Sequence, residues 1–418
     1  MGLPRISRVF GAVNIGSFRI SAMILGQSES GELIVLGSGH RASQGVRGGY
    51  IVDMAAATYA IRDVVERAEK SAGTGIASVW VGCSGAGLAN RVSQVEVPVG
   101  GRRIEGEDIQ HLLLSARDTI QPDGKMVLHA QPAQYTLDGA HGAVDPKGLH
   151  AERLGVDIHV MLADGAPVKN LRDAVEGAHL SVEAVVAAPI ACAEACLSPE
   201  ERELGTAVVE IGSEITNVSI FENGMLRALH SIPFGSGDIT DAIAGDFGIR
   251  RFQAERLKCV AGSAIASPSD HREMLPLVAQ VDGAPEADKI SRAELVSVVT
   301  SQVSRLTDEI NRVFKSFDFG ATRGGQVVLT GGGAELAGIA EFAQGALGRP
   351  VRIGKPAGMR GLPDAHATPG FTTLAGLCLY AARDPMDIRS IESNVQETVR
   401  YGGMALVKRV LKASREYF

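Results

Sequence analysis

The sequence lacks the long apolar run that a membrane-spanning helix needs, because its 418 residues contain no apolar stretch of about 18 residues or more. The first residues also lack the apolar core of a secretory signal peptide. Excess positive charge is missing as well, since the formal net charge is −7 at pH 7. We therefore expect no spanning helix, no cleaved leader and no nucleic-acid partner.

Cysteine is scarce, and the five cysteines form no metal-binding pattern. Cys192 and Cys196 lie four positions apart, but no second pair or neighbouring histidine completes a ligand set. His111, His129 and His159 are scattered over different predicted elements. We expect buried free thiols in a reducing compartment, and structural or surface histidines.

Glycine is abundant, with 50 residues, and alanine, valine and isoleucine dominate the apolar set. This composition favours an α/β protein with many tight turns. The chain is long enough for two to four folded units with sizeable cores.

A hairpin pattern occurs twice, in Val9–Leu25 and in Ala207–Phe221. An offset of 196 positions sets Asn14 on Glu210 and aligns five identical residues: Val13 with Val209, Ile15 with Ile211, Gly16 with Gly212, Ser17 with Ser213, and Ile24 with Ile220. Each copy reads as strand, Gly-Ser turn and strand. The repeat predicts a duplicated α/β domain with a cleft between its halves. Two unrelated hairpins are the weaker alternative.

A glycine-rich turn lies in Val327–Gly338. Its apolar start predicts a buried strand, Gly331–Gly333 predict a tight turn, and Ala334–Ala343 predicts a helix. Successive glycines between a strand and a helix suit a nucleotide that rests on the backbone. An ordinary strand-to-helix turn explains this stretch equally well by itself.

The two hairpins and the Leu-Thr-Gly-Gly-Gly turn together resemble the actin/Hsp70/sugar-kinase ATPase superfamily. The resemblance implies ATP between two halves, with phosphates at the hairpin turns and the nucleoside at the triple-glycine turn. It implies these nucleotide-binding residues: Asn14, Gly16, Ser17, Phe18, Arg19, Gly212, Ser213, Thr216, Glu255, Lys258, Gly331, Gly332, Gly333 and Glu335. By spacing alone, Glu255 and Lys258 are a solvated helical pair.

Four further stretches resemble the bacterial FtsA cell-division family, and the resemblance runs from about Val9 to the last residue. They are Val-Gly-Cys-Ser-Gly at 81–85, Asp-Pro-Lys-Gly-Leu-His-Ala-Glu-Arg-Leu at 145–154, Ala-Pro-Ile-Ala-Cys-Ala-Glu-Ala at 188–195, and Ser-Ile-Pro-Phe-Gly-Ser-Gly-Asp-Ile-Thr-Asp-Ala-Ile-Ala at 231–244. The resemblance implies an actin-like duplicated ATPase fold with an inserted α+β subdomain. The implied partners are the FtsZ C-terminal peptide, further copies in a filament, anionic lipid and later division proteins, at the septum on the cytoplasmic face of the inner membrane.

The expected domain boundaries follow from these patterns. They are 1–84 and 164–203 for the first half, 85–163 for the inserted subdomain, 204–248 and 320–382 for the second half, 249–319 for a helical subdomain, 383–403 for a linker, and 404–418 for an amphipathic helix.

The two hairpin turns depart from the superfamily pattern. Asn14 and Asn217 stand where carboxylates are usual, and Ser213 and Glu214 replace two glycines. A Glu214 carboxylate about 4 Å from a phosphate would be repelled by about 4 kcal/mol at an effective dielectric constant near 20, unless a cation intervenes or the side chain turns outward. Glu210 remains a candidate catalytic residue that reaches Mg²⁺ through water. We expect nucleotide binding with slow or absent hydrolysis.

The helical subdomain ends in a predicted helix, Ile290–Phe314, whose Ser291 and Glu294 form a capping box. The family resemblance places the FtsZ peptide on this subdomain. Arg292 and Arg305 are candidates for pairing with its acidic groups. Ordinary solvated charges explain these two arginines equally well.

The chain closes with a polar segment, Arg383–Gly403, and an amphipathic stretch, Met404–Phe418. One face of the predicted helix is apolar and the other is basic. We expect it to lie on anionic lipid through Leu406, Val407, Val410, Leu411 and Phe418, with Lys408, Arg409, Lys412 and Arg415 at the headgroups. A helix packed on the protein's own surface is the alternative.

These expectations describe a division scaffold. A working ATPase or sugar-type kinase is the alternative from the enzyme class, although no catalytic Asp or sugar-binding loop is evident. An actin-like adaptor of another envelope machine, such as pilus assembly, is the third possibility.

Overall fold

The structure is a computed structural model that describes residues 5–85, 87–143, 145–277, 289–321 and 325–391. The predicted membrane helix and most of the predicted linker lie outside these residues. Within them, no helix combines the length and apolar character that crossing a membrane requires.

Two five-stranded sheets form the body of the molecule and share one strand order. The first sheet runs β3 (Leu33–Ala42), β2 (Arg19–Ser28), β1 (Ile6–Ile15), β6 (Ser78–Cys83) and β11 (Ser181–Ala187). The second runs β14 (Met225–Ile232), β13 (Thr216–Glu222), β12 (Thr206–Ile211), β17 (Gln326–Thr330) and β18 (Val351–Ile353). In each, three antiparallel strands are followed by two parallel ones. The duplication predicted from the hairpin repeat is confirmed.

The register of the two hairpins confirms the offset as well. Asn14 pairs with Ser21 in the first hairpin, and Glu210 pairs with Asn217 in the second. All four positions are related by the same offset of 196 residues. The two copies are therefore equivalent residue by residue at their turns.

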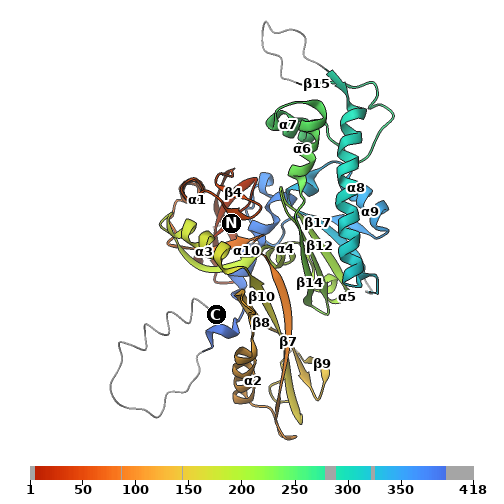
Figure 1. The fold of residues 1–418 in the computed structure, drawn as a ribbon. Coiled ribbons are helices and arrows are strands. Elements are labelled where there is room, and N and C mark those ends of the chain that lie inside the picture. Colours follow the sequence, from red (N-terminus) through yellow and green to blue (C-terminus); the bar gives the residue numbers. More distant parts are fainter. Residues whose placement is uncertain (1–4, 86, 144, 278–288, 322–324, 392–418) are drawn as a thin grey trace.

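Helices pack between and around the sheets (Figure 1). Helix α4 (Ala188–Cys196) contacts strands of both sheets, whereas α10 (Thr372–Arg383) lies on the first sheet and crosses α4. Gly376 permits this crossing, because a Cβ there would lie 1.7 Å from the Ala191 carbonyl oxygen. Helices α1 (Met54–Ala72) and α3 (Gly165–Glu176) also pack on the side of the first sheet, whereas α5 (Pro199–Leu204) contacts β13 of the second sheet. A small hairpin joins β4 (Val46–Arg47) to β5 (Tyr50–Ile51). Asp53 caps α1, because its side chain accepts from the Ala56 N–H.

The inserted subdomain forms the lower end of the molecule in Figure 1 and has its own apolar core. Its sheet has the order β7 (Ala89–Pro98), β10 (Arg153–Ala163), β8 (Met126–Leu137) and β9 (Ala140–Ala143), and α2 (Gly106–Thr119) packs on it.

The first residues of the predicted linker pack against the inserted subdomain. Ile388, in the short 3₁₀ turn Ile388–Ser390, is fully buried in the core of the inserted subdomain. The Arg389 guanidinium donates to the carbonyls of Val127 and Leu128 at 2.6 Å. This docking could not be predicted from the sequence, because a single isoleucine makes no periodic pattern.

The helical subdomain contains α6 (Ser236–Phe247), α7 (Arg251–Ala261) and the long α8 (Arg292–Ser316). The predicted capping box at Ser291 is confirmed. A short ribbon of β15 (Met274–Pro276) and β16 (Lys289–Ser291) was not expected.

The helix predicted at Ala334–Ala343 begins later than predicted. The chain forms 3₁₀ turns at Phe319–Ala321, Gly332–Glu335, Asp364–His366 and Pro369–Phe371, and α9 begins only at Ile339 and ends at Leu347. Gly338 interrupts the helix, because its φ of 73° lies in the left-handed region.

Candidate functional site

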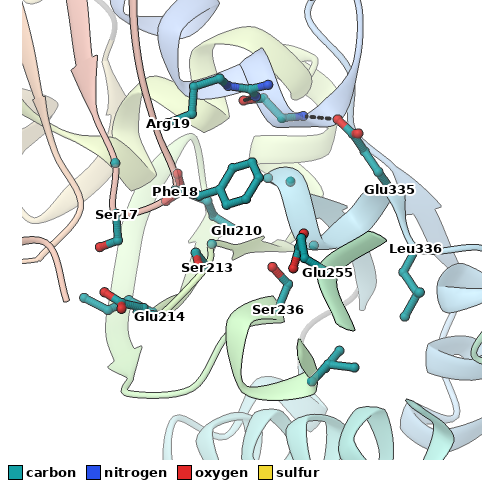
Figure 2. Close-up of a pocket in the computed structure, with 18 of the residues that line it drawn as sticks. Ser17, Phe18, Arg19, Glu210, Ser213, Glu214, Ser236, Glu255, Glu335 and Leu336 are labelled. Atoms are coloured by element: carbon teal, nitrogen blue, oxygen red, sulfur yellow. Dashed lines mark hydrogen bonds between the residues drawn. The ribbon is translucent and has the colours of Figure 1, made fainter. Parts of the chain in front are cut away.

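A cavity of about 420 Å³ lies between the two halves. Its walls come from the tips of both hairpins, the triple-glycine turn, α7 and the start of α10. Figure 2 shows Ser17 and Glu214 at one end of this cavity and Glu335 and Leu336 at the other. The predicted residues that line it are Asn14, Gly16, Ser17, Phe18, Arg19, Glu210, Gly212, Ser213, Glu255, Lys258, Gly331, Gly332, Gly333 and Glu335.

Thr216 is the one predicted nucleotide-binding residue that the cavity lining does not include. Its side chain is fully buried on β13, and its hydroxyl donates to the Phe234 carbonyl at 2.8 Å. The hydroxyl therefore ties β13 to the segment just before α6, and a nucleotide contact of Thr216 stays a prediction.

The two hairpin tips have the same backbone geometry. The Gly16 N–H donates to the Arg19 carbonyl at 3.1 Å, and the equivalent Gly212 N–H donates to the Ile215 carbonyl at 2.9 Å. Each turn leaves two tip residues, Ser17 and Phe18 in the first, and Ser213 and Glu214 in the second. In the part of the chain that the structure describes, the N–H groups of these four residues have no hydrogen-bond acceptor. Converging free N–H groups are a favourable place for an anion.

The triple-glycine turn forms the opposite wall, and two of its glycines are required by close packing. A Cβ at Gly331 would lie 2.5 Å from the Ile211 carbonyl oxygen, and one at Gly333 would lie 2.2 Å from the Ile211 side chain. Gly332 differs, because nothing lies within 4 Å of its Cβ position. This central glycine therefore leaves open space where a ligand can approach the backbone.

Arg19 and Glu335 close one side of the cavity around Gly370. The Arg19 guanidinium donates to the Gly370 carbonyl at 2.8 Å and lies 3.9 Å from the centre of the Phe371 ring. Glu335 accepts from the Gly370 N–H at 3.0 Å (Figure 2). Burial lowers the pKa of Arg19, and the nearby Glu335 carboxylate opposes that shift. Phe18 projects from the first hairpin into the cavity and is 55% exposed.

Glu255 and Lys258 line the cavity from α7 and are not a solvated pair. The Lys258 ammonium lies 2.8 Å from a Glu255 carboxylate oxygen, from the Ser236 carbonyl and from the Thr240 hydroxyl. Burial acts to raise the pKa of Glu255, but hydrogen bonds from Lys258 and Thr240 outweigh it, so that this pKa is lowered. Lys258 therefore joins α7 to α6, and its charge is already compensated.

Glu210 sits in a buried hydrogen-bond network that joins the two halves. One carboxylate oxygen accepts from the Thr373 hydroxyl at 2.6 Å, and the other accepts from the Asn217 amide at 2.9 Å. Asn217 also donates to the Ser84 carbonyl and accepts from the Ser231 hydroxyl. Asn217 thus supplies a donor where an aspartate would place a second carboxylate.

The residues fit a nucleotide better than they fit a protein-held metal. The buried Asn14 side-chain oxygen lines the cavity and has no hydrogen-bond partner, which suits a ligand or a ligand-bound water. Among the described residues, no group of three or more His, Cys, Asp and Glu side chains could hold a metal ion. A role for Glu210 toward Mg²⁺ through water stays a prediction.

The two candidate partner-binding arginines lie in different surroundings. Arg292 lines the cavity and pairs at 2.7 Å with Asp270, which is 1% exposed. Arg305 is exposed on α8, and its guanidinium lies 5.3 Å from the centre of the Phe234 ring. Of the two, Arg305 is the more exposed to solvent.

Sequence reasoning missed Gly49, Thr373 and Gly370 as cavity residues. The Pro-Gly-Phe-Thr-Thr run gave no capping signal for Gly370 and Thr373, because Phe371 and not a threonine is the N-cap of α10. Gly49 gave no signal, because only the tertiary fold brings the β4–β5 turn to the cavity.

Two family models match the chain. The one described as "Cell division protein FtsA" matches residues 207–376, and the one described as "SHS2 domain inserted in FTSA" matches residues 85–162. Curated proteins named cell division protein FtsA are also similar. The protein from Agrobacterium fabrum is 33% identical over 94% of this chain and 93% of its own, and the protein from Escherichia coli is 27% identical over 97% of both.

Solved structures share the fold. The PilM–PilN type IV pilus biogenesis complex contains a chain with a TM-score of 0.62 and 17% identity, covering 89% of this chain and 98% of that one. MreB5 of Spiroplasma citri bound to ADP gives a TM-score of 0.55 and 14% identity, covering 90% and 97%. These similarities confirm the predicted actin-like architecture, and the second family model confirms the inserted subdomain.

Proposed function

The chain belongs to the FtsA family of cell division proteins, and from that premise we propose that it is an actin-like division scaffold that holds ATP between its two halves. Nucleotide binding is supported by the two equivalent hairpin tips, which border one cavity opposite the open backbone at Gly332. Among the described residues, the four N–H groups at these tips have no hydrogen-bond acceptor. Phosphates are the anions that such glycine-rich turns and free N–H groups suit.

Gly332→Val tests nucleotide binding without disturbing the packing. The new side chain meets no atom within 4 Å of its Cβ and enters the cavity, so the fold is expected to persist. We expect the affinity for fluorescent ATP to fall by about tenfold or more. Gly345→Val is the matched control, because Gly345 also has open space around its Cβ but lies on the exposed side of α9. Equal affinity in both variants would contradict the assigned cavity.

We propose that hydrolysis is slow or absent. Glu210 already accepts from Thr373 and Asn217, and neither neighbour can remove a proton from an attacking water. Phosphate release by the purified full chain with Mg²⁺ measures this. Rapid turnover that Glu210→Ala abolishes would refute the scaffold interpretation and support a working ATPase.

We propose that the FtsZ C-terminal peptide binds the helical subdomain near Arg305, whose charge is exposed. Arg305→Glu should weaken co-sedimentation with FtsZ, because it reverses the charge that an acidic peptide meets. Arg312→Glu is the control two turns further along the same helix, where Arg312 pairs with Glu309. A similar loss in both variants would mean that only the net charge of α8 matters.

We propose that the last fifteen residues anchor the scaffold to anionic lipid and that filament formation strengthens this attachment. The support is the amphipathic sequence pattern, because these residues lie outside the described part. Leu406→Glu combined with Leu411→Glu should release the protein from vesicles that contain phosphatidylglycerol. Deleting residues 404–418 should do the same while leaving FtsZ binding intact. Undiminished vesicle binding in either case would refute the anchor. Sedimentation with ATP, without FtsZ or vesicles, tests the filament.

A further inference from the structure

The Glu214 side chain reaches from one half of the molecule to the other at one end of the cavity. It leaves the tip of the β12–β13 hairpin and accepts a hydrogen bond from the Gly48 N–H, in the turn between β4 and β5. The carboxylate has therefore turned away from its own hairpin tip without leaving the cavity wall, which includes Glu214.

The same glycine turn also binds the first hairpin. The Gly49 N–H donates to the Ser17 hydroxyl at 3.2 Å, so adjacent backbone amides hold Ser17 and Glu214 side by side, as Figure 2 shows. Gly48 and Gly49 both have positive φ, and a Cβ at Gly49 would lie 2.8 Å from the Gly85 Cα. The turn is thus tightly fixed and holds the Glu214 charge at the end of the cavity formed by the hairpin tips.

The positive charges near Glu214 already have partners. Arg251, at the start of α7, interacts electrostatically with Glu214, but its guanidinium pairs with Asp241 at 2.6 Å. The cavity is lined by three cationic side chains among the described residues, and each has a partner elsewhere. Lys258 pairs with Glu255, Arg292 pairs with Asp270, and Arg19 donates to the Gly370 carbonyl. In the described part of the chain, the groups at the hairpin tips that have no partner are therefore neutral N–H groups.

We propose that Glu214 is a specificity-determining residue that makes the cleft favour a nucleoside diphosphate over a nucleoside triphosphate. A nucleoside held at the triple-glycine turn directs its phosphate chain toward the hairpin tips. Each additional phosphate brings more negative charge toward the fixed Glu214 carboxylate, and the repulsion rises as the separation falls. A superfamily turn with glycine at this position would carry no such charge. This inference rests on the nucleotide binding proposed above.

Glu214→Gln separates the charge from the hydrogen bond. The glutamine carbonyl can still accept from the Gly48 N–H, so the contact between the halves is retained while the charge is lost. The affinities of the full chain for ADP and for ATP are measured by calorimetry with saturating Mg²⁺. We expect Glu214→Gln to raise the affinity for ATP by about tenfold and that for ADP by less than about threefold.

Glu222→Gln is the matched control, because Glu222 lies at the other end of β13 and pairs with Arg227. Its ratio of ATP to ADP affinity should equal that of the wild type. If the wild type binds both nucleotides and Glu214→Gln leaves the ratio unchanged, or if Glu222→Gln shifts it equally, the specificity role is overturned and nucleotide binding stands. Absence of binding in every variant would overturn both.

Discussion

Replacing Asn217 by aspartate probes the network that joins the two halves. Asn217 is 1% exposed, and its amide donates to Glu210 at 2.9 Å. Asn217→Asp removes that donor and sets a second carboxylate against the first. The side-chain volume hardly changes, so the effect comes from charge and hydrogen bonding and not from packing.

The magnitude follows from the separation of the two carboxylates. Two unit charges about 3 Å apart repel by about 5 to 6 kcal/mol at an effective dielectric constant near 20. Protonating an ordinary carboxyl group at pH 7 costs about 4 kcal/mol, because pH 7 lies about three units above its usual pKa. One proton is therefore taken up, and the free energy of unfolding should fall by about 4 kcal/mol at pH 7. Because the folded variant binds the additional proton, its deficit shrinks by about 1.4 kcal/mol for each unit by which the pH is lowered toward 4.

The thermal unfolding of Asn217→Asp and of the wild type, measured between pH 7 and pH 5, gives the comparison. Asn90→Asp is the matched control. Asn90 donates to the carbonyls of Leu226 and Arg227, so the same donor is lost without a facing carboxylate. Added Mg²⁺ should restore part of the stability of Asn217→Asp, because two adjacent carboxylates attract a divalent cation.

A stability of Asn217→Asp at pH 7 equal to that of Asn90→Asp would refute the reasoning. It would mean that Glu210 and residue 217 separate in solution, so that no buried network joins the halves through them. A deficit that stays constant between pH 7 and pH 5 would refute the charge mechanism and leave only the lost donor.

Three further outcomes are expected. Burial lowers the pKa of His159 to about 4 and that of His129 well below its usual value. Because the unfolded chain therefore binds more protons, the stability that is present above about pH 6.5 is lost as the pH falls toward 4, by about 3 kcal/mol for His159. Hydrogen exchange of β8 and β10 should accelerate over that pH range. Ile388→Ala should destabilise the inserted subdomain by about 3 kcal/mol, seen as faster exchange in that subdomain alone; unchanged exchange would mean that the segment does not dock. Gly376→Ala would bring a Cβ within 1.7 Å of a backbone oxygen of α4, so the yield of soluble protein should collapse, whereas Gly345→Ala, with open space around it, should express normally.

The duplicated fold could be predicted because each hairpin is a local structure whose turn and strands carry their own pattern. The offset between the copies then indicated which residues are equivalent, and the strand registers agree with it. Caps could be predicted for the same reason, since Asp53 and Ser291 bond N–H groups only three residues further along. The start of α9 could not, because helix propensity did not reveal the left-handed φ of Gly338.

The sequence predicted most of the residues that line the site, but not the hydrogen bonds and ion pairs that they make there. Thirteen of the fourteen residues expected to bind nucleotide line the cavity. Thr216 lies outside the lining, because alternation along β13 turns its side chain to the other face. The burial of Lys258 against α6 and the pairing of Arg292 with Asp270 were not evident. Both depend on partners that α6 and Asp270 bring to them in the folded chain.

The sequence by itself determined that two equivalent glycine-containing turns and a triple-glycine turn exist, because these are local patterns with strict backbone requirements. Only the tertiary structure decided what the substituted residues do. The Glu214 carboxylate meets an amide 166 residues away, and Glu210 meets Thr373 on α10, the helix that packs on the first sheet. Charges and hydrogen-bond donors act through space, so their partners follow from the packing of the two halves and not from the order of residues along the chain.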